Sequence, residues 1–290
     1  MSFCRRTWLL APAVFWLAFA GFVFSGQPAG PGDFHFVILG DRTGETQGDT
    51  FQRVWSEAGA GNPVFVVTVG DTIQGFEDAT AESQWREVER IFGPYRRDRL
   101  FLTPGNHDIW SPASEKLFSK YAGHPPHYSF DYGPAHFTIL DNSRSDELSA
   151  EEIRFLEADL KAHASQSLKF IVSHRPSWLF NAVAAHTDFP LHRLARQYGV
   201  QYVIAGHLHE MLHFRLEGVD YISVPSGGGH LRGNQKYEDG WFFGYIGVDV
   251  KQNKANFRVH EVPLPGQPRR VTELNDWGPA GLAASLQVPG

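Results

Sequence analysis

The chain has 290 residues, of which 42% are hydrophobic and 14% aromatic, so it is long enough to bury one large core. Its formal net charge is −6 at pH 7 and its sequence contains no basic stripe, which argues against a stable nucleic-acid partner. The single cysteine is Cys4. If the first residues are removed, the mature chain has no disulfide and offers no thiolate to a metal.

Residues 1–26 have the pattern of a targeting segment. Arg5 and Arg6 precede a run from Trp8 to Phe24 that contains no charged residue, and small residues follow. The run is short for a membrane-spanning helix, which needs about 20 apolar residues. We therefore favour a cleaved signal peptide over an N-terminal membrane anchor. The first would make the protein exported, either periplasmic or extracellular, and the second would attach it to a membrane.

After a Gly/Pro-rich joint at residues 27–32, strand and helix patterns alternate. Apolar runs typical of strands cover residues 34–39, 64–69, 100–103, 168–172 and 202–205. Helical spacing of apolar residues recurs at 51–58 and 85–92, a capping box of Ser149 and Glu152 opens another helix, and a further helix is expected from Leu191 to Tyr198. Beyond Gly206 only strands are expected, at 212–216, 221–224, 241–250 and 255–262.

These patterns predict an α/β protein with packed sheets and flanking helices. The polar motifs described next are spread over most of the chain and must converge, so we expect a single domain at residues 33–262. The remaining residues, 263–290, are rich in Pro and Gly and are expected to be a tail that wraps the surface or is disordered.

Five short polar motifs each follow an apolar run. They are Gly40–Gly44, Gly70-Asp71, Gly105–Asp108, Ser173-His174 and Gly206–His209. Side chains delivered from the ends of separate strands meet in the crevice beyond an α/β sheet. Carboxylate, carboxamide and imidazole together suit borderline cations such as Zn, Mn and Fe. The motifs therefore predict a metal centre, with a pair of metals bridged by one carboxylate.

In this order the motifs resemble those of the calcineurin-like metallophosphoesterases, whose pattern is D-x-H, G-D-x-x-D/N, G-N-H-D/E, H and G-H-x-H. The last three elements match in full. Thr43 stands where the family has a metal-binding histidine, and Gln74 stands where it has Asp or Asn. The resemblance extends from Phe34 to Val250 and implies a two-sheet αββα sandwich.

The resemblance also implies a set of metal ligands, in which Asp71 bridges two divalent or trivalent ions of Mn, Fe or Zn. The first ion would be held by Asp41, Asp71 and His209, and the second by Asp71, Asn106, His174 and His207. The first site is expected to be weak, because a threonine hydroxyl at position 43 is a poor ligand for these cations. Taken alone, Asp41 and Asp71 could equally be helix N-caps.

Three further residues are candidates for catalysis or substrate binding. In the family, the histidine at the position of His107 is not a ligand and lies near the leaving-group oxygen, where it could donate a proton. Asp108 would orient His107 by a hydrogen bond, although the same residues could simply stabilise a turn. Arg42 could clamp phosphate oxygens, pair with Glu45 or point into solvent.

One motif points to a different activity. Residues 209–213 read His-Glu-Met-Leu-His and fit H-E-x-x-H, the zinc-protease motif. That motif works only on a helix, where histidines four residues apart share a face. Here it begins inside a Gly-His-x-His turn and runs into a strand-like stretch, so we do not favour it.

The sequence therefore predicts an exported phosphoesterase that hydrolyses a phosphate mono- or diester through a metal-activated hydroxide at a dinuclear site. The alternative is a weakly catalytic or non-catalytic protein that binds metal or phosphate, because Thr43 leaves the first site incomplete.

Overall fold

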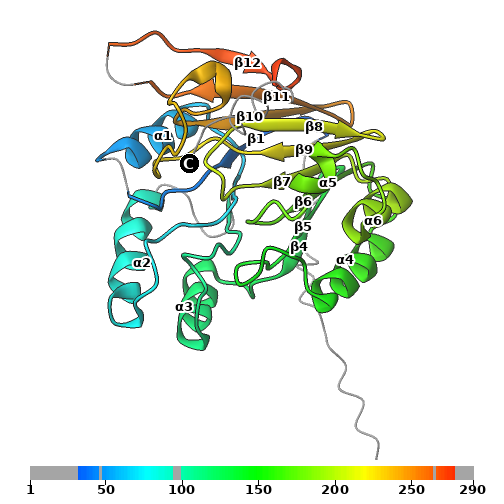
Figure 1. Ribbon diagram of the computed structural model, residues 1–290, viewed down its shortest axis with the longest axis horizontal. Helices are drawn as coiled ribbons and strands as arrows, with labels where there is room; N and C mark the ends of the chain where they lie inside the picture. The colour runs from blue at the N-terminus through cyan, green and yellow to red at the C-terminus, as the bar shows by residue number, and fades with distance from the viewer. Residues whose placement is uncertain (1–31, 46–47, 94–98, 264–265, 278–290) are drawn as a thin grey trace, which may run out of the picture.

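The computed structural model describes residues 32–45, 48–93, 99–263 and 266–277, and places two six-stranded sheets face to face (Figure 1). The first sheet has the order β12 (Val271–Glu273), β11 (Lys254–Glu261), β10 (Gly244–Lys251), β1 (Phe34–Leu39), β2 (Val66–Thr68) and β3 (Leu100–Phe101). The second has the order β4 (Tyr128–Tyr132), β5 (Ala135–Ile139), β6 (Leu168–Val172), β7 (Tyr202–Ala205), β9 (Val219–Ser223) and β8 (Leu212–Leu216).

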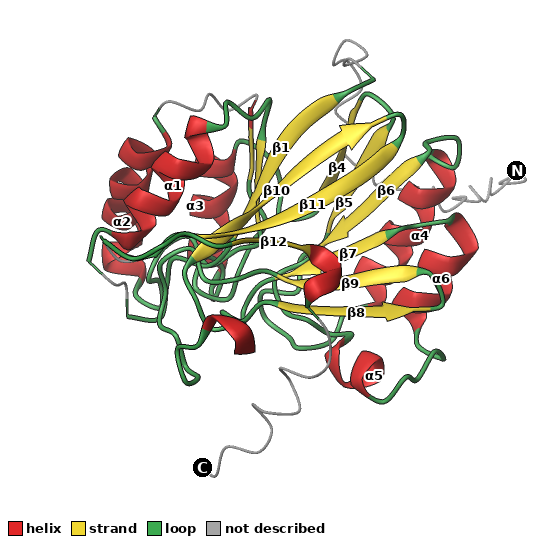
Figure 2. Ribbon diagram, turned by 90° about the horizontal axis from the view of Figure 1, so that it is seen from above, coloured by secondary structure: helices red, strands yellow, loops and turns green. Residues whose placement is uncertain are grey.

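Helices cover the outer face of each sheet (Figure 2). The first sheet is covered by α1 (Thr50–Ala60), α2 (Asp78–Phe92) and α3 (Pro112–Ala122), whose apolar faces pack against it in one buried cluster. The second is covered by α4 (Ala150–Ala162), α5 (Leu179–Val183) and α6 (Pro190–Tyr198) in another. This arrangement confirms the predicted αββα sandwich.

The main core lies between the sheets and is rich in aromatic rings. On β1, Phe34, Phe36 and Ile38 point into this core, whereas the alternate residues Val37 and Leu39 pack under the helices. The period of two is that of a strand, and a central strand buries both faces.

Rings from the two sheets interlock in this core. Phe36 lies edge-on to Phe137 with ring centroids 5.3 Å apart, and Phe137 stacks on Phe170 at 4.5 Å. Since β1 and Phe36 belong to one sheet and Phe137 and Phe170 to the other, the rings fix how the sheets face each other.

Parallel pairing determines where the polar motifs meet. Strands β1, β2 and β3 run parallel to one another, as do β5, β6, β7 and β9. The carboxyl ends of the strands in each set therefore lie at one edge of their sheet. Asp41 follows β1 of the first sheet and His174 follows β6 of the second, and Asp41 Oδ1 lies 3.5 Å from His174 Nδ1. The two edges thus meet at a single place.

Residues 271–277 differ from the expected wrap or disordered tail. Strand β12 pairs antiparallel with β11, and Trp277 is buried in the core between Tyr237 and Phe242, at centroid distances of 5.2 and 5.4 Å. Composition misled here because a strand of three residues anchored by one tryptophan leaves no periodic signal.

The proposed targeting segment, residues 1–26, lies outside the described residues. Within the part of the chain that the structure describes, no helix has the length and apolar character needed to cross a membrane.

Candidate metal centre

The structure brings all the sequence-predicted ligands together at the carboxyl ends of the strands. Among these ligands, two groups of side chains have ligand atoms within 4.8 Å of one another, and Asp71 belongs to both. The first group is Asp41, Asp71 and His209, and the second is Asp71, His174 and His207, with the Asn106 side chain beside it. Because the two groups share Asp71, they are adjacent.

In the first group, His209 has a defined orientation. Its Nδ1–H donates to the carbonyl oxygen of His230 at 2.6 Å, which leaves Nε2 facing Asp41 Oδ1 at 3.9 Å. A ring nitrogen fixed in this way by a backbone carbonyl is typical of metal-binding histidines. Burial raises the pKa of the Asp41 carboxyl, whose two oxygens accept the backbone N–H of His207.

In the second group, His174 is the central residue. Its Nδ1–H donates to the carbonyl oxygen of Val69 at 2.8 Å, so Nε2 carries the lone pair in the neutral ring. That Nε2 lies 3.2 Å from Asp71 Oδ1, 3.0 Å from Asn106 Oδ1 and 3.1 Å from His207 Nδ1. A carboxylate oxygen, an amide oxygen and an imidazole nitrogen thus lie within 3.2 Å of a fourth potential ligand atom, His174 Nε2. This donor set therefore fits a cation.

Opposite charges dominate the electrostatics of these groups. Burial lowers the pKa of His174, but the Asp71 and Asp41 carboxylates more than offset this and raise it to about 9. Burial raises the pKa of Asp71, but His174 and His107 outweigh it and hold that pKa well below its usual range. Burial and the neighbouring His174 lower the pKa of His207 to about 3, so its ring stays neutral and able to coordinate.

The backbone at this edge is strained at three of the candidate ligands. Asp71, His207 and His209 have φ values of 56°, 70° and 61°, in the left-handed region that non-glycine residues avoid. Each such residue costs about 1–3 kcal/mol and persists only where its surroundings enforce it.

Two motif glycines permit the close approach of the aspartates. A Cβ at Gly105 would lie 2.2 Å from Asp71 Oδ1, and one at Gly206 would lie 2.7 Å from Asp41 Oδ2. Any side chain at either position would displace a candidate ligand.

Asp108 does not orient the His107 ring as expected. The His107 Nδ1–H donates to the carbonyl oxygen of Gln74 at 2.5 Å, whereas the Asp108 carboxylate accepts the backbone N–H groups of Thr72, Ile73 and Gly105 at 2.9, 3.2 and 2.9 Å. The carboxylate is buried beneath the loop and is saturated by amides, so it cannot reach the ring. Burial raises its pKa to about 7, and the Asp71 carboxylate acts in the same direction.

Arg42 also differs from its expected role as a phosphate clamp. Its guanidinium pairs with Glu87 of α2, at 2.6 Å between Nη2 and Oε1, and lies over the Phe51 ring at 5.7 Å. The guanidinium charge is therefore already paired and buried between α1 and α2. The predicted alternatives, a bridge to Glu45 or a solvent-facing side chain, are not what the structure shows.

Thr43 is completely buried, and its Oγ1 has no hydrogen-bond partner among the described residues. Its backbone lies beside the first group, since a Cβ at Gly229 would lie 2.0 Å from the Thr43 carbonyl oxygen and 2.7 Å from His209 Cε1. A buried hydroxyl without a partner costs about 1–3 kcal/mol.

The zinc-protease motif is not formed. Residues Leu212–Leu216 are strand β8, so His209 and His213 do not share a helix face. His213 instead contacts Asp220 of β9 at 2.9 Å and the carbonyl oxygen of Trp277.

Sequence reasoning missed Asn142, which positions His174. Its Oδ1 accepts the N–H groups of His174 and Arg175 at 3.1 and 3.0 Å, and its Nδ2 donates to the Arg175 carbonyl oxygen. The available signal was its place, because it lies three residues after the apolar strand β5 ends, and the candidate ligands likewise lie just beyond apolar runs.

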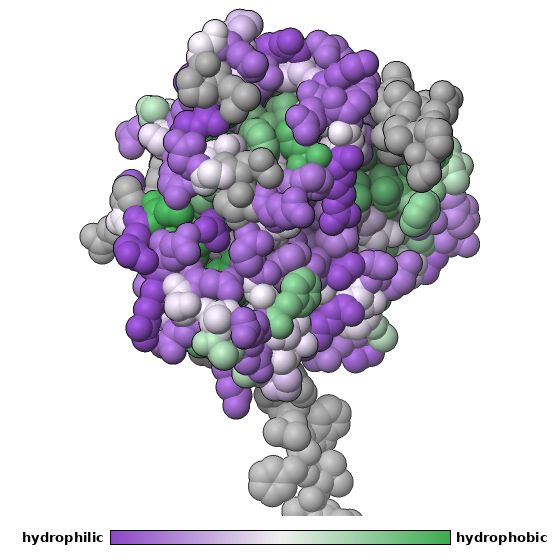
Figure 3. Space-filling model, turned by 60° about the vertical axis from the view of Figure 1, so that its left-hand side comes forward, coloured by the Kyte–Doolittle hydropathy of each residue, from purple (hydrophilic) through white to green (hydrophobic). Residues whose placement is uncertain are grey.

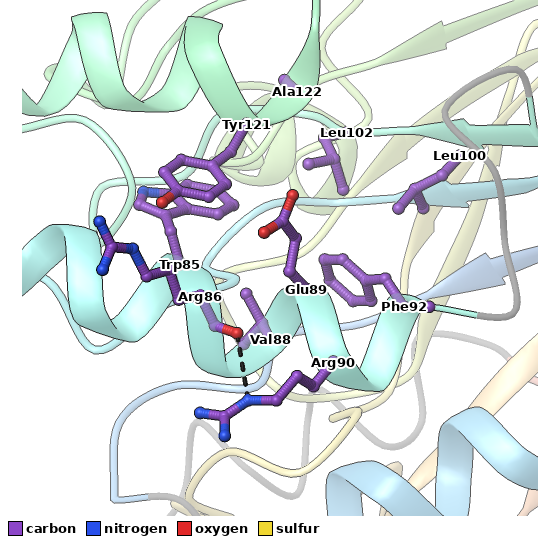
Figure 4. A pocket seen from close by; sticks show the side chains of 11 residues that line it. Trp85, Arg86, Val88, Glu89, Arg90, Phe92, Leu100, Leu102, Tyr121 and Ala122 are labelled. Atoms are coloured by element: carbon purple, nitrogen blue, oxygen red, sulfur yellow. Dashed lines mark hydrogen bonds between the residues drawn. The ribbon is translucent and has the colours of Figure 1, made fainter.

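A separate hollow lies between α2, α3 and β3 (Figure 4). Glu89 stands between Tyr121 and Phe92 there, and the wall is completed by apolar side chains of β3 and α3 (Figure 4). None of the candidate ligands lines it.

The side of the molecule that carries α1 and α2 is largely hydrophilic, with small apolar patches (Figure 3).

Known proteins resemble this chain in sequence and in fold. The family model for calcineurin-like phosphoesterases matches residues 32–211, more than half of the chain. The chain belongs to the calcineurin-like phosphoesterase family. The matched region includes every candidate ligand.

Among the relatives is purple acid phosphatase 15 of Arabidopsis thaliana, which is 26% identical over 155 residues. The match covers 44% of this chain but only 29% of that relative, so the chain corresponds to less than a third of it.

Two solved structures share the fold. A purple acid phosphatase, PPD1, from yellow lupin (Lupinus luteus) superposes with a TM-score of 0.60 and 16% identity, over 91% of this chain and 57% of that one. GAP50, described as the anchor in the inner membrane complex of Plasmodium, superposes with a TM-score of 0.58 and 15% identity. This match covers 84% of this chain and 89% of that one. At these identities the likeness concerns the fold alone.

Proposed function

We propose that this protein is an exported, metal-dependent phosphoesterase that hydrolyses a phosphate mono- or diester at a dinuclear site. The observation that carries the proposal is the position of Asp71, which belongs to two adjacent groups of candidate ligands. A carboxylate has two oxygens and can bridge two cations about 3.5–4 Å apart. Family membership supports the reaction class.

The candidate ligands would divide between two metals according to which ligand atoms lie within 4.8 Å of one another. Asp41, Asp71 and His209 would hold the first ion. Asp71, Asn106, His174 and His207 would hold the second. When bound, such ions supply Lewis-acid activation of water and neutralise the phosphate oxygens, and Mn, Fe or Zn would suit this mixture of ligands.

His107 would assist the leaving group. Because Nδ1–H is committed to the Gln74 carbonyl oxygen, Nε2 is the atom turned toward the centre, 3.9 Å from Asp71 Oδ2. Protonated at Nε2, the ring can donate to the departing oxygen of a phosphate ester. The backbone N–H of His107 also donates to Asp71 Oδ1 at 2.9 Å, which fixes the ring relative to the carboxylate.

Thr43 favours a second candidate, a binding protein with little or no activity. No imidazole completes the first group at this position, so the first metal would be held weakly. The unpartnered hydroxyl is compatible with a water molecule in this site. The second group is complete and His107 lies beside it, so we infer an enzyme rather than a storage protein.

Export rests on the charge and hydropathy pattern of residues 1–26. Membrane association would follow only if that segment stays attached. The expected partner is a phosphate-ester substrate, and the acidic net charge supports the absence of a stable nucleic-acid complex.

The direct test combines metal analysis with ester hydrolysis. Protein loaded with Mn, Fe or Zn should cleave a chromogenic aryl phosphate mono- or diester, bind up to two ions per chain, and lose activity with a chelator. Asp71→Ala should reduce metal content and abolish hydrolysis, whereas Asp188→Ala, an exposed aspartate, should do neither. A loaded, folded protein that is inert toward both ester classes would favour the binding protein.

A further inference from the structure

An exposed aromatic residue stands next to the proposed proton donor. Phe76 is 58% exposed, and its φ of 61° places it in the left-handed region. A bulky residue there is strained, and exposure of a phenyl ring forgoes the hydrophobic gain that would offset the strain. Strain of this kind gathers at functional sites, so the position calls for an explanation other than folding.

The loop that carries Phe76 is held firmly. The Gly75 N–H donates to Gln84 Oε1 at 3.0 Å, and the Gln74 carbonyl oxygen accepts from His107. A Cβ at Gly75 would lie 1.9 Å from the His107 carbonyl oxygen, so the loop touches the His107 backbone directly. The Phe76 ring is therefore presented by a constrained backbone, two residues before α2 begins.

Phe76 forms an aromatic surface with two neighbours. Its ring centroid lies 4.5 Å from that of His107 at an interplanar angle of 61°, and 6.0 Å from that of Trp110. The other edge of the His107 ring faces Asp71, the shared residue of the two ligand groups. The aromatic surface is thus one imidazole ring away from the proposed metals, on the side where the proposed proton donor lies.

We propose that Phe76 forms a binding subsite for a planar aromatic leaving group, so that the preferred substrates are aryl or nucleoside phosphate esters. This rests on the proposed function, because it assumes that phosphate is held at the metals. Bases and aryl rings stack on exposed aromatic side chains with little demand for hydrogen bonds. Such stacking changes affinity by about 5- to 150-fold per ring.

The first test measures binding of uncleavable probes, so it does not depend on turnover. Metal-loaded protein should bind phenylphosphonate at least about fivefold more tightly than propylphosphonate, measured by calorimetry. Phe76→Ala and Phe76→Leu should both abolish the preference, and Phe76→Tyr should retain it. All three variants carry the same backbone strain, which makes them matched. Phe180→Ala removes another exposed phenylalanine, 84% exposed on α5, and should have no effect.

The second test measures kcat/KM for phenyl phosphate, a nucleoside 5′-monophosphate and glycerol phosphate. Phe76→Ala should lower the first two selectively, mainly through KM, and the larger of the two losses identifies the aryl or the nucleoside class.

The subsite proposal would be overturned by any of three results. These are equal losses for all three esters, an unchanged preference for the ring in Phe76→Ala, and a preference retained in Phe76→Leu. A wild-type protein that prefers phenylphosphonate through Phe76 but cleaves no ester would uphold the subsite and refute the proposed function.

Discussion

The carboxylate of Asp108 holds the loop that follows Asp71. Asp108 Oδ1 accepts the N–H groups of Thr72 and Ile73, the two residues directly after Asp71, whose φ is 56°. Asp108 Oδ2 accepts the N–H of Gly105, at the position where the chain passes against Asp71. One buried side chain thereby joins the second and third motifs and enforces the strained backbone of the proposed bridging ligand.

Asp108→Asn should destabilise the fold and weaken metal binding together. An amide has one oxygen and one NH₂ group, so an asparagine must face either Gly105 or the Thr72 and Ile73 amides with a donor. A buried donor left without an acceptor costs about 1–3 kcal/mol, and the loop that holds Asp71 should relax. Chemical denaturation and metal titration measure the two effects.

Asp188→Asn is the matched control for this substitution, because Asp188 is an exposed partner of Arg193 and such pairs contribute about 0–1 kcal/mol. Unchanged stability and metal affinity in Asp108→Asn would mean that Asp108 does not hold the loop.

A buried histidine between the third and fourth motifs should control the pH dependence of stability. His136 lies between two carboxylates, 2.7 Å from Asp131 and 2.8 Å from Asp159, and its ring is fully buried. Burial lowers the pKa of His136, but hydrogen bonds to Asp131 and Asp159 outweigh it and the net direction is upward. Burial raises the pKa values of Asp131 and Asp159, but the hydrogen bonds to His136 and its charge outweigh burial and lower both values.

The sign of each contribution follows from these directions. His136 stabilises the fold fully below its ordinary pKa of 6.5, and this contribution is lost as pH rises through the higher folded value. The two carboxylates contribute above their ordinary pKa of 3.8 and lose that contribution as pH falls through the lower folded values. This group of residues therefore favours the folded state most between these two ordinary values.

His136→Leu tests this dependence. The variant removes one hydrogen-bond partner of the buried Asp159 carboxylate, which keeps Ser129, Thr138 and His163, so at pH 6 the free energy of unfolding should fall by about 1–3 kcal/mol. The loss should be smaller at pH 9, where the wild type has begun to lose the same interaction. Denaturant titrations at both values measure it. An equal loss at pH 6 and pH 9 would show that His136 is neutral and simply packed.

Local patterns in the sequence predicted an α/β protein with packed sheets and flanking helices, whereas the two-sheet sandwich and the ligand set were implied by the family resemblance. Apolar runs gave the bounds of β6, β7 and β8 as observed. Each candidate ligand follows such a run, and parallel pairing then brings the strand ends together. Helix α3 was not predicted, since its buried positions are only Ser114, Phe118 and Ala122, although the Ser111 cap and Pro112 were an available start signal.

Long side chains could not be placed from sequence, because their partners depend on packing. Glu152 was expected to complete a capping box. The Ser149 hydroxyl does accept its N–H at 3.1 Å, but the Glu152 carboxylate contacts His127 and the Asp141 N–H instead. Arg42 similarly pairs with Glu87, 45 residues away, because α2 packs beside the first motif. No local spacing encodes either pairing.

His107→Asn should slow esters with poor leaving groups far more than activated aryl esters. A proton donor matters when the departing oxygen is basic, and general acids contribute about 10²–10⁴-fold. Asparagine can still donate to the Gln74 carbonyl oxygen, so the loop should remain in place. Comparing kcat for an alkyl phosphate and 4-nitrophenyl phosphate measures the difference. If both substrates lose the same factor, His107 acts on structure or binding instead.

Thr43→His should tighten the first metal site and move the stoichiometry toward two ions per chain. Position 43 is buried beside the first group, as the close approach of Gly229 to both Thr43 and His209 shows. Neutral imidazole is a strong ligand for Mn, Fe and Zn, whereas a threonine hydroxyl is weak. The larger ring should cost about 1–3 kcal/mol of stability in the absence of metal, because the site is already packed. Thr43→Val, which removes the unpartnered hydroxyl and keeps the shape, is the control and should leave metal binding unchanged. Metal titration of the three proteins separates the effects, and a Thr43→His protein that folds but binds metal like the wild type would mean that position 43 does not face the centre.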